Sequence, residues 1–141
     1  MPEFNDFEAE ERALGYAERY GSLLQTISFL ISWPSLDRTA RVVIARAKEL
    51  DGDHYELLTP AADALAAKHP LAATLLLRAM IDFSLTRSRA SRYGHAARHL
   101  RDCSGLAAKI QDYLCFETHD TYVSRLHKDH SRKAAFWTLV S

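Results

Sequence analysis

Apolar residues recur along this chain at spacings of three and four, which is the period of an α-helix with one buried face. No segment shows the strict alternation of a half-buried strand. The pattern predicts helices over residues 7–19, 23–31, 36–50, 55–68, 70–85, 93–103, 106–114, 118–130 and 132–140.

Proline, glycine and capping residues mark the ends of these helices. We expect breaks at Trp33-Pro34, Asp51-Gly52 and Ser104-Gly105, since proline and glycine disfavour continuation of a helix. Pro60 could follow a cap or kink its helix. Thr118 or Asp120 can cap the helix that runs to His130.

The helix that opens at His69-Pro70 is the most apolar of the set. Leu71, Leu75, Ala79 and Phe83 share one face, and neighbouring apolar residues widen it. A helix that is apolar over so wide an arc needs neighbours on both sides. We therefore expect this helix to be central.

The expected fold class is all-α, with eight to nine helices paired as antiparallel hairpins. The hairpins could stack as a right-handed, tetratricopeptide-like solenoid or close into an irregular bundle. No fixed 34-residue period is present, so any repeat is degenerate. With 141 residues, 48% of them hydrophobic, the chain is expected to form a single helical-repeat-like domain over residues 1–141.

The charges cancel overall but are unevenly placed. Residues 1–60 are biased toward acidic groups and residues 61–141 toward basic groups, with 18 of each sign in the whole chain. A neutral chain disfavours a nucleic-acid partner. The asymmetry is compatible with an acidic partner on the second half, with a head-to-tail homo-oligomer, or with solvated helix faces.

The remaining sequence signals favour a cytoplasmic protein. Cys103 and Cys115 form no metal or redox motif of the C-x-x-C type and read as reduced thiols. The acidic start of the chain lacks the apolar region of a signal peptide. No apolar run reaches the length of a membrane span, so no membrane partner is expected.

Five stretches carry a family resemblance that covers nearly the whole chain. They are DFEAEERAL from Asp6, WPSLDRTARVVIARAKELDGDHYELL from Trp33, HPLAATLLLRAMID from His69, YGHAARHL from Tyr93, and the tail from Tyr122 to Trp137. Together they resemble the C-terminal part of an uncharacterised proteobacterial family, a domain of unknown function.

The resemblance implies an all-helical, tetratricopeptide-like fold without assigned catalytic residues. It also implies a fragment or shortened member, because members of that family are longer at the N-terminus. A weaker similarity is to the helical regions that follow SWIM zinc fingers. The Cys-x-Cys and Cys-x-His pattern of the finger is absent, so no zinc site is carried over.

Histidine and cysteine offer one candidate constellation. His95, His99 and Cys103 fall at i, i+4 and i+8 on one predicted helix, a spacing that can present metal ligands. The H-E-x-x-H pattern of zinc hydrolases is missing. Structural or surface histidines are the simpler interpretation, so no metal or other cofactor is predicted. His119, His127 and His130 form a second group near the end of the chain.

Arginines supply the other candidate site. They are dense from Arg87 to Arg101, and guanidinium groups suit carboxylate or phosphate partners. Asp82 follows Arg78 by four residues, which allows a buried structural pair. The predicted partner-binding residues are Arg78, Arg89, Arg92, His95 and His99.

The sequence favours a non-catalytic helical scaffold that binds a protein or peptide, possibly an acidic one. No phosphate-binding loop, dinucleotide motif or nucleophile elbow is present, so an enzyme is unsupported. Two alternatives stay open. One is a metal-binding or enzymatic site at His95, His99 and Cys103, and the other is a purely structural C-terminal domain.

Overall fold

A computed structural model describes residues 23, 25–27 and 36–140 of the chain. The chain divides into two compact units, residues 1–50 and residues 51–141, and each is described by itself. The helices predicted over 7–19 and 23–31 lie wholly or mostly outside the described residues, as does the Trp33-Pro34 break.

In the first unit, α3 spans Leu36–Ala45 and a 3-10 helix, η1, spans Ala47–Glu49. The predicted single helix over 36–50 is therefore wrong in its second half. Arg46 reaches forward and forms a two-pronged ion pair with Glu49, with both N–O distances at 2.7 Å. Thr39, Ala40, Val42 and Val43 are the buried residues of α3.

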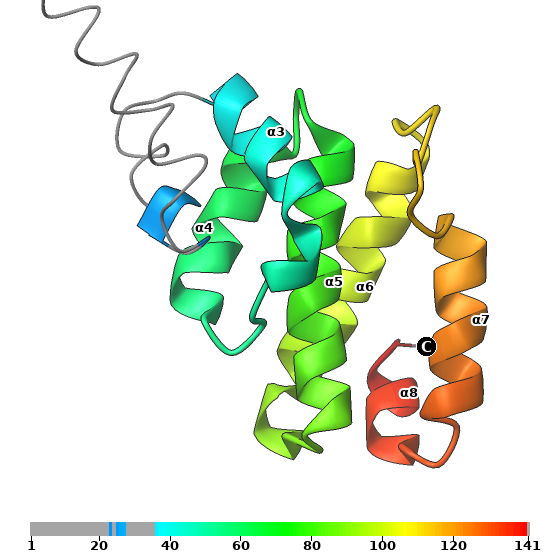
Figure 1. Cartoon of the computed structure of the whole chain (residues 1–141). Helices are drawn as coiled ribbons and strands as arrows, with labels where there is room; N and C mark the ends of the chain where they lie inside the picture. The colour runs from blue at the N-terminus through cyan, green and yellow to red at the C-terminus, as the bar shows by residue number, and fades with distance from the viewer. Residues whose placement is uncertain (1–22, 24, 28–35, 141) are drawn as a thin grey trace, which may run out of the picture. The chain divides into compact units, whose positions relative to one another are not determined.

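The second unit is built from antiparallel helices. They are α4 Tyr55–Leu65, α5 Pro70–Thr86, a 3-10 helix η2 Ala90–Arg92, α6 Tyr93–Ala107, α7 His119–Asp129 and α8 Ala134–Val140. From α4 to α7, each α-helix runs opposite to the one before it (Figure 1). The predicted helical hairpins are thus present in this unit.

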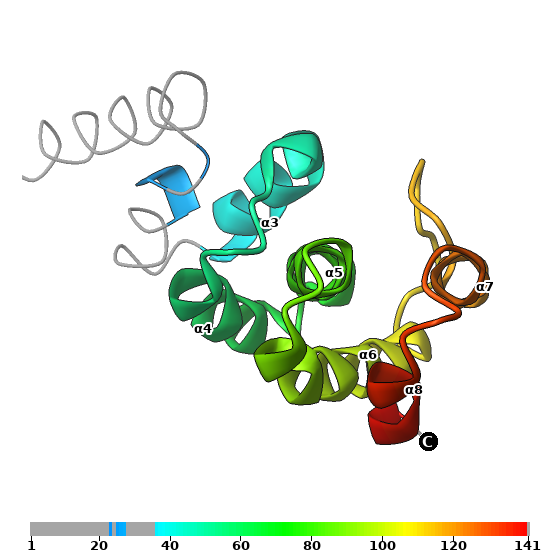
Figure 2. The same cartoon turned by 90° about the horizontal axis from the view of Figure 1, so that it is seen from below.

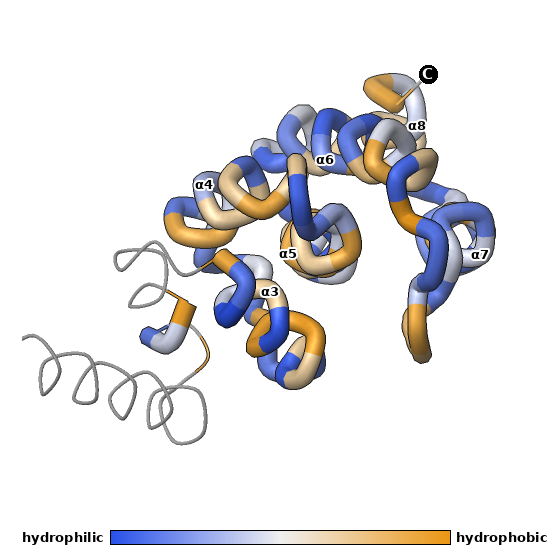
Figure 3. The backbone as a smooth tube through the Cα atoms, turned by 90° about the horizontal axis from the view of Figure 1, so that it is seen from above, coloured by the Kyte–Doolittle hydropathy of each residue, from blue (hydrophilic) through white to orange (hydrophobic). Residues whose placement is uncertain are grey.

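Helix α5 is the centre of the second unit, as its wide apolar arc predicts. It packs against α4 and α6, and most of its side chains are buried, including Leu76, Ile81 and Leu85. Figure 2 shows α5 beside both helices. Helices α7 and α8 lie on the side of α6 that faces away from α4. In Figure 3 α5 is mostly orange and pale, whereas α7 is mostly blue and white. Pro70 occupies the first turn, where its missing N–H costs nothing.

A close backbone approach joins the start of this unit to α5. Gly52 is buried against the helix, and a Cβ atom built on it would lie 2.0 Å from the carbonyl oxygen of Ala79. Only glycine fits so close to another backbone. The prediction that Asp51-Gly52 ends a helical segment is compatible with this contact, because α4 begins only at Tyr55.

Two predicted boundaries in the second unit are wrong. Helix α4 ends at Leu65, three residues before the predicted end, and it carries Pro60 in its interior. Helix α6 runs through Ser104-Gly105 to Ala107, and no separate helix covers 106–114. Glycine has a low helix propensity, but Leu106, the next residue, is buried. Its packing outweighs the cost of Gly105 in α6.

The segment between α6 and α7 is irregular and carries a strained residue. Leu114 has a backbone φ of 56°, in the left-handed region that branched side chains avoid. The carboxylate of Asp112 supports this turn by accepting a hydrogen bond from the Leu114 N–H at 2.8 Å. Leu114 is exposed.

The last two helices follow their predicted limits closely. Thr118 caps α7 and its hydroxyl accepts from the Thr121 N–H at 3.3 Å. Helix α8 begins two residues later than predicted, at Ala134. Phe136 is fully buried with its ring edge-on to Tyr93 of α6, at 6.1 Å between centroids.

Within the described residues the protein is all-helical: residues 23 and 25–27 are α-helical, α3 to α8 and two short 3-10 helices follow, and there is no strand. The expected eight to nine helices included one at 106–114 that is not there. No helix in the described part of the chain is long and apolar enough to cross a membrane.

Candidate functional site

The turn between α5 and α6 gathers three arginines around one aromatic ring. The guanidinium carbons of Arg87, Arg89 and Arg92 lie 5.7, 5.8 and 5.3 Å from the centre of the Phe83 ring. Such stacking holds a guanidinium in place while leaving its N–H edges free to bond. We call residues 87–92 the arginine turn.

The charges of this turn are only partly neutralised. Arg92 forms an ion pair with Asp53 at 2.9 Å and lies over the Tyr55 ring at 4.8 Å. Arg87 and Arg89 are exposed, and neither is in an ion pair with any carboxylate of the described residues. The ammonium of Lys133 donates to the Ser88 hydroxyl at 2.8 Å and brings a further positive charge to the turn.

His95, His99 and Cys103, the candidate metal ligands of the alternative interpretation, do not share one environment. His95 is exposed, whereas His99 and Cys103, one and two turns further along α6, are buried. Among the described residues, no group of three or more His, Cys, Asp or Glu side chains could hold a metal ion. The prediction that His95 and His99 bind a partner stays a prediction, and only His95 faces solvent.

Burial governs the protonation of both interior groups on α6. The pKa of His99 is lowered, chiefly because burial disfavours the imidazolium, with Asp102 opposing the shift. Burial raises the pKa of the Cys103 thiol to about 12. A thiol with so high a pKa is a poor nucleophile and a poor metal ligand at neutral pH.

Arg78 lies in the interior, between α5 and the segment that precedes α7. Its side chain is 6% exposed, so it does not line an open groove in this structure. Nη1 donates to the carbonyl oxygen of Glu117 at 2.8 Å. The guanidinium carbon lies 4.5 Å from the centre of the Tyr122 ring and 5.5 Å from that of Tyr113.

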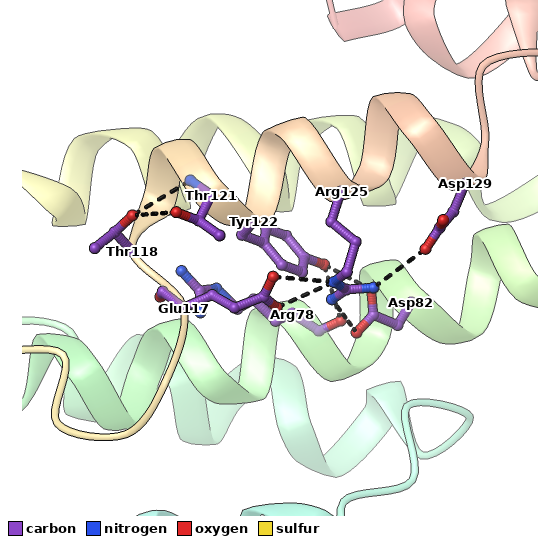
Figure 4. Close-up of polar contacts among 8 residues, drawn as sticks. All are labelled: Arg78, Asp82, Glu117, Thr118, Thr121, Tyr122, Arg125 and Asp129. Carbon is purple, nitrogen blue, oxygen red and sulfur yellow. Dashed lines mark hydrogen bonds and ion pairs between the residues drawn. The ribbon is translucent and has the colours of Figure 1, made fainter.

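A polar network continues from Arg78 toward α7 (Figure 4). The Tyr122 hydroxyl donates to Asp82 at 2.8 Å, and Arg125 lies 3.8 Å from the same carboxylate. Arg125 Nε also donates to the Glu117 carboxylate, at 3.0 and 3.1 Å to its two oxygens. We call Arg78, Asp82, Glu117, Tyr122 and Arg125 the Arg78 cluster.

Arg78 and Asp82 are thus not paired with each other, and each bonds to a different partner. Asp82 faces Tyr122 and Arg125 on α7, and Arg78 bonds to the backbone at Glu117. Burial raises the pKa of Asp82, opposed by the Tyr122 hydrogen bond and the Arg125 charge. Burial raises the pKa of Tyr122 well above its ordinary value, so its hydroxyl remains a donor.

The three C-terminal histidines have separate surroundings. His127 stacks on Trp137, with the ring centres 3.7 Å apart, and the His130 carbonyl accepts from the Trp137 indole N–H at 2.9 Å. His119 lies near Arg78, and burial followed by the Arg78 charge lowers its pKa. These contacts give His127 and His130 a structural explanation.

The sequence interpretation missed Tyr113, Glu117, Tyr122 and Arg125 as members of one site. Their partners on α5 are 35 to 44 residues away, and no spacing rule joins positions so distant. One signal was present: Tyr122 and Arg125 are three apart on a predicted helix and therefore share a face.

Comparison with known proteins gives one finding. A family described as a family of unknown function, DUF6880, matches residues 1–139. No curated protein and no solved structure matches the chain. With nearly its whole length matched, the chain belongs to the DUF6880 family.

Proposed function

We propose that this protein is a non-catalytic helical module that binds an acidic segment of a partner protein through the arginine turn. The observation that carries the proposal is the set of three guanidinium groups around Phe83, of which only Arg92 has a carboxylate partner among the described residues.

The surroundings of the turn suit a carboxylate-rich partner. Arg87 and Arg89 are exposed and already stacked, so binding would cost them less side-chain entropy than free arginines. Each can grip a carboxylate with two parallel N–H bonds. Lys133 adds charge nearby through its bond to Ser88. The antiparallel hairpins supply a rigid base, in keeping with a tetratricopeptide-like scaffold.

An acidic protein is favoured over nucleic acid because the chain has no net charge and no recognisable nucleic-acid-binding motif. Phe83, the ring at the centre of the arginine turn, is covered by the three arginines and is not free to stack on a base. Cytoplasmic location stays part of this proposal.

A fluorescein-labelled peptide of ten alternating Asp and Glu residues is a suitable probe, with binding followed by fluorescence anisotropy. We expect the double variant Arg87→Glu/Arg89→Glu to weaken binding at least tenfold, because it reverses two attractive charges. The matched control, Arg98→Glu/Lys109→Glu, makes the same charge change at exposed positions outside the turn.

Equal losses in both double variants would mean that only net charge matters, and the arginine turn would not be a site. Tighter binding of a single-stranded DNA of equal charge would favour the nucleic-acid alternative. Affinity should also fall as NaCl rises from 50 to 500 mM, because salt screens exposed charges.

A further inference from the structure

The guanidinium of Arg78 is buried and forms no ion pair with any carboxylate of the described residues. The two acids closest to it in the network are already engaged, Glu117 by Arg125 and Asp82 by Tyr122 and Arg125. The single hydrogen bond from Arg78 Nη1 goes to an uncharged carbonyl oxygen. A buried guanidinium without an ion-pair partner is costly unless a further group bonds to it.

The edge of the Arg78 guanidinium that has no acceptor among the described residues is the edge with which arginine binds anions. Nε and Nη2 are both buried, and no group of the described residues accepts from either. These two nitrogens form the side-on fork of arginine, whose parallel N–H bonds match two oxygens of a carboxylate or phosphate. The Nη1 bond to Glu117 and the two tyrosine rings hold the fork in one orientation.

Further buried donors without partners lie on α5 and on the segment that bonds to Arg78. The Tyr113 hydroxyl is buried and unpaired, and the Tyr113 ring lies beside Arg78. Nδ1 of His119, a residue close enough to feel the Arg78 charge, is also buried and unpaired. Thr74, one turn before Arg78 on the same face of α5, has an unpaired buried hydroxyl as well.

Buried polar atoms without partners are rare in folded proteins, and several around one charge call for an explanation. All of these groups can donate a hydrogen bond, and the fixed charge among them is positive. We infer that Arg78, Tyr113 and His119 form a site for a small oxyanion, a phosphate or carboxylate group held side-on by the Arg78 fork.

The test measures thermal unfolding of the full chain while sodium phosphate or sodium acetate is added, with NaCl adjusted to keep ionic strength constant. A ligand that binds only the folded state raises Tm, by about 9 °C once its concentration is a hundredfold above Kd. A shift with phosphate alone assigns the site to phosphate groups, and one with acetate alone assigns it to carboxylates.

Three variants locate the site. Arg78→Met removes the fork and should abolish the shift, and Arg78→Lys keeps the charge without the fork and should weaken binding about tenfold. Tyr113→Phe keeps the ring beside Arg78 but removes one donor, so binding should weaken several-fold while the fold is unchanged. Arg98→Met is the control, because it removes an exposed arginine from α6.

An NMR readout keeps the inference testable if Arg78→Met does not fold. The Nε–H signal of Arg78 should move on titration with the effective anion in the wild-type chain. The inference is overturned if neither anion shifts Tm or this signal, or if Tyr113→Phe binds as tightly as Arg98→Met. It is also overturned if Arg87→Glu/Arg89→Glu removes the shift and Arg78→Met retains it. That result would place the anion at the arginine turn.

Discussion

At the scale of single residues, Gly52 has only a hydrogen atom as its side chain, and this lets its backbone pack directly against α5. Its backbone lies so close to α5 that an added methyl group would overlap the Ala79 carbonyl and approach the Phe83 Cβ to 2.8 Å. Phe83 is also the ring at the centre of the arginine turn. A small change at Gly52 therefore reaches a proposed binding surface.

We expect Gly52→Ala to lower the free energy of unfolding by about 2 kcal/mol, since the clash is with backbone that cannot move aside. Gly105→Ala is the matched control. It changes a glycine of α6 that has open space around its Cβ, so it should stabilise the protein by roughly 0.5 kcal/mol. Urea unfolding measures both values, and equal effects would contradict the close approach.

The two thiols should differ sharply in reactivity. Cys115 is exposed, whereas Cys103 is buried with a pKa of about 12. At pH 7.5 we expect iodoacetamide to modify the native protein at Cys115 and to modify Cys103 only after unfolding. Peptide mass spectrometry reads out both sites, and modification of native Cys103 at the rate of Cys115 would contradict its burial.

His99 gives the folded protein a defined response to acid. Because its pKa is lower in the folded state than the ordinary 6.5, the unfolded state binds its proton more tightly. Its neutral form is fully compatible with the fold above pH 6.5, and stability falls as the pH drops below that value. Asp102 and Asp63 reduce the effect, and His95 and Arg98 add to it.

We expect His99→Gln to flatten the decline in unfolding free energy between pH 7.5 and pH 5, measured by urea titration at each pH. His119 and His130, whose pKa values are also lowered by burial, contribute to the decline in the same sense and will leave part of it in the variant. His54→Gln, a change at an exposed histidine outside α6, is the control. An unchanged slope in His99→Gln would refute the assignment.

At the scale of elements, α5 and α7 are joined mainly by long polar side chains. The Tyr122 hydroxyl reaches both the Asp82 carboxylate and, at 3.4 Å, the Arg78 carbonyl oxygen. By contrast, α8 is held to α6 by the apolar ring contact of Phe136 with Tyr93. Loss of the Tyr122 hydroxyl should therefore loosen α7 specifically.

Tyr122→Phe is expected to cost about 1 to 2 kcal/mol of unfolding free energy, because it removes a buried hydrogen bond and leaves Asp82 without that donor. Asp129→Asn is the matched control, since its 3.8 Å pair with Arg125 is exposed and should contribute less than about 0.5 kcal/mol. Hydrogen exchange should report faster opening of α7 in the first variant alone.

The limits of sequence interpretation are clearest in the elements. Helix α5 was predictable because Pro70 fixes its start and its apolar face is unbroken to Phe83. Thr118 as the cap of α7 followed from local chemistry. The continuation of α6 through Gly105 did not follow from local chemistry, because burial of Leu106 and Cys103 overrides the low helix propensity of glycine.

The candidate sites divide in the same way. The arginine turn was visible as a run of charges, although its ring at Phe83 was not. Arg78 looked like an exposed partner residue or half of a local pair with Asp82. Its real neighbours, Tyr113 and Glu117, come from an irregular segment whose path depends on tertiary contacts.

At the scale of the whole molecule, the second unit has its own hydrophobic core. Leu58 and Leu65 of α4, Leu76 of α5, Leu100 of α6 and Leu126 of α7 are all buried. The chain's division between residues 50 and 51 falls one residue before Gly52. A single domain over 1–141 stays a prediction, and this division suggests how to test it.

We expect a fragment of residues 51–141 to fold alone, with a helical circular dichroism spectrum and one cooperative thermal transition. A fragment carrying Leu76→Ala is the control, because removing a fully buried leucine should cost about 3 kcal/mol and lower its Tm. A fragment without a cooperative transition would instead support one domain that needs its first 50 residues.

The side chains that tie α7 to α5 also cover Arg78. Because Arg78 is only 6% exposed, we expect an anion to reach its guanidinium while this tie is broken, at a rate set by how often α7 separates. The anion would then bind slowly and dissociate slowly, so a complex of modest affinity could still be long-lived.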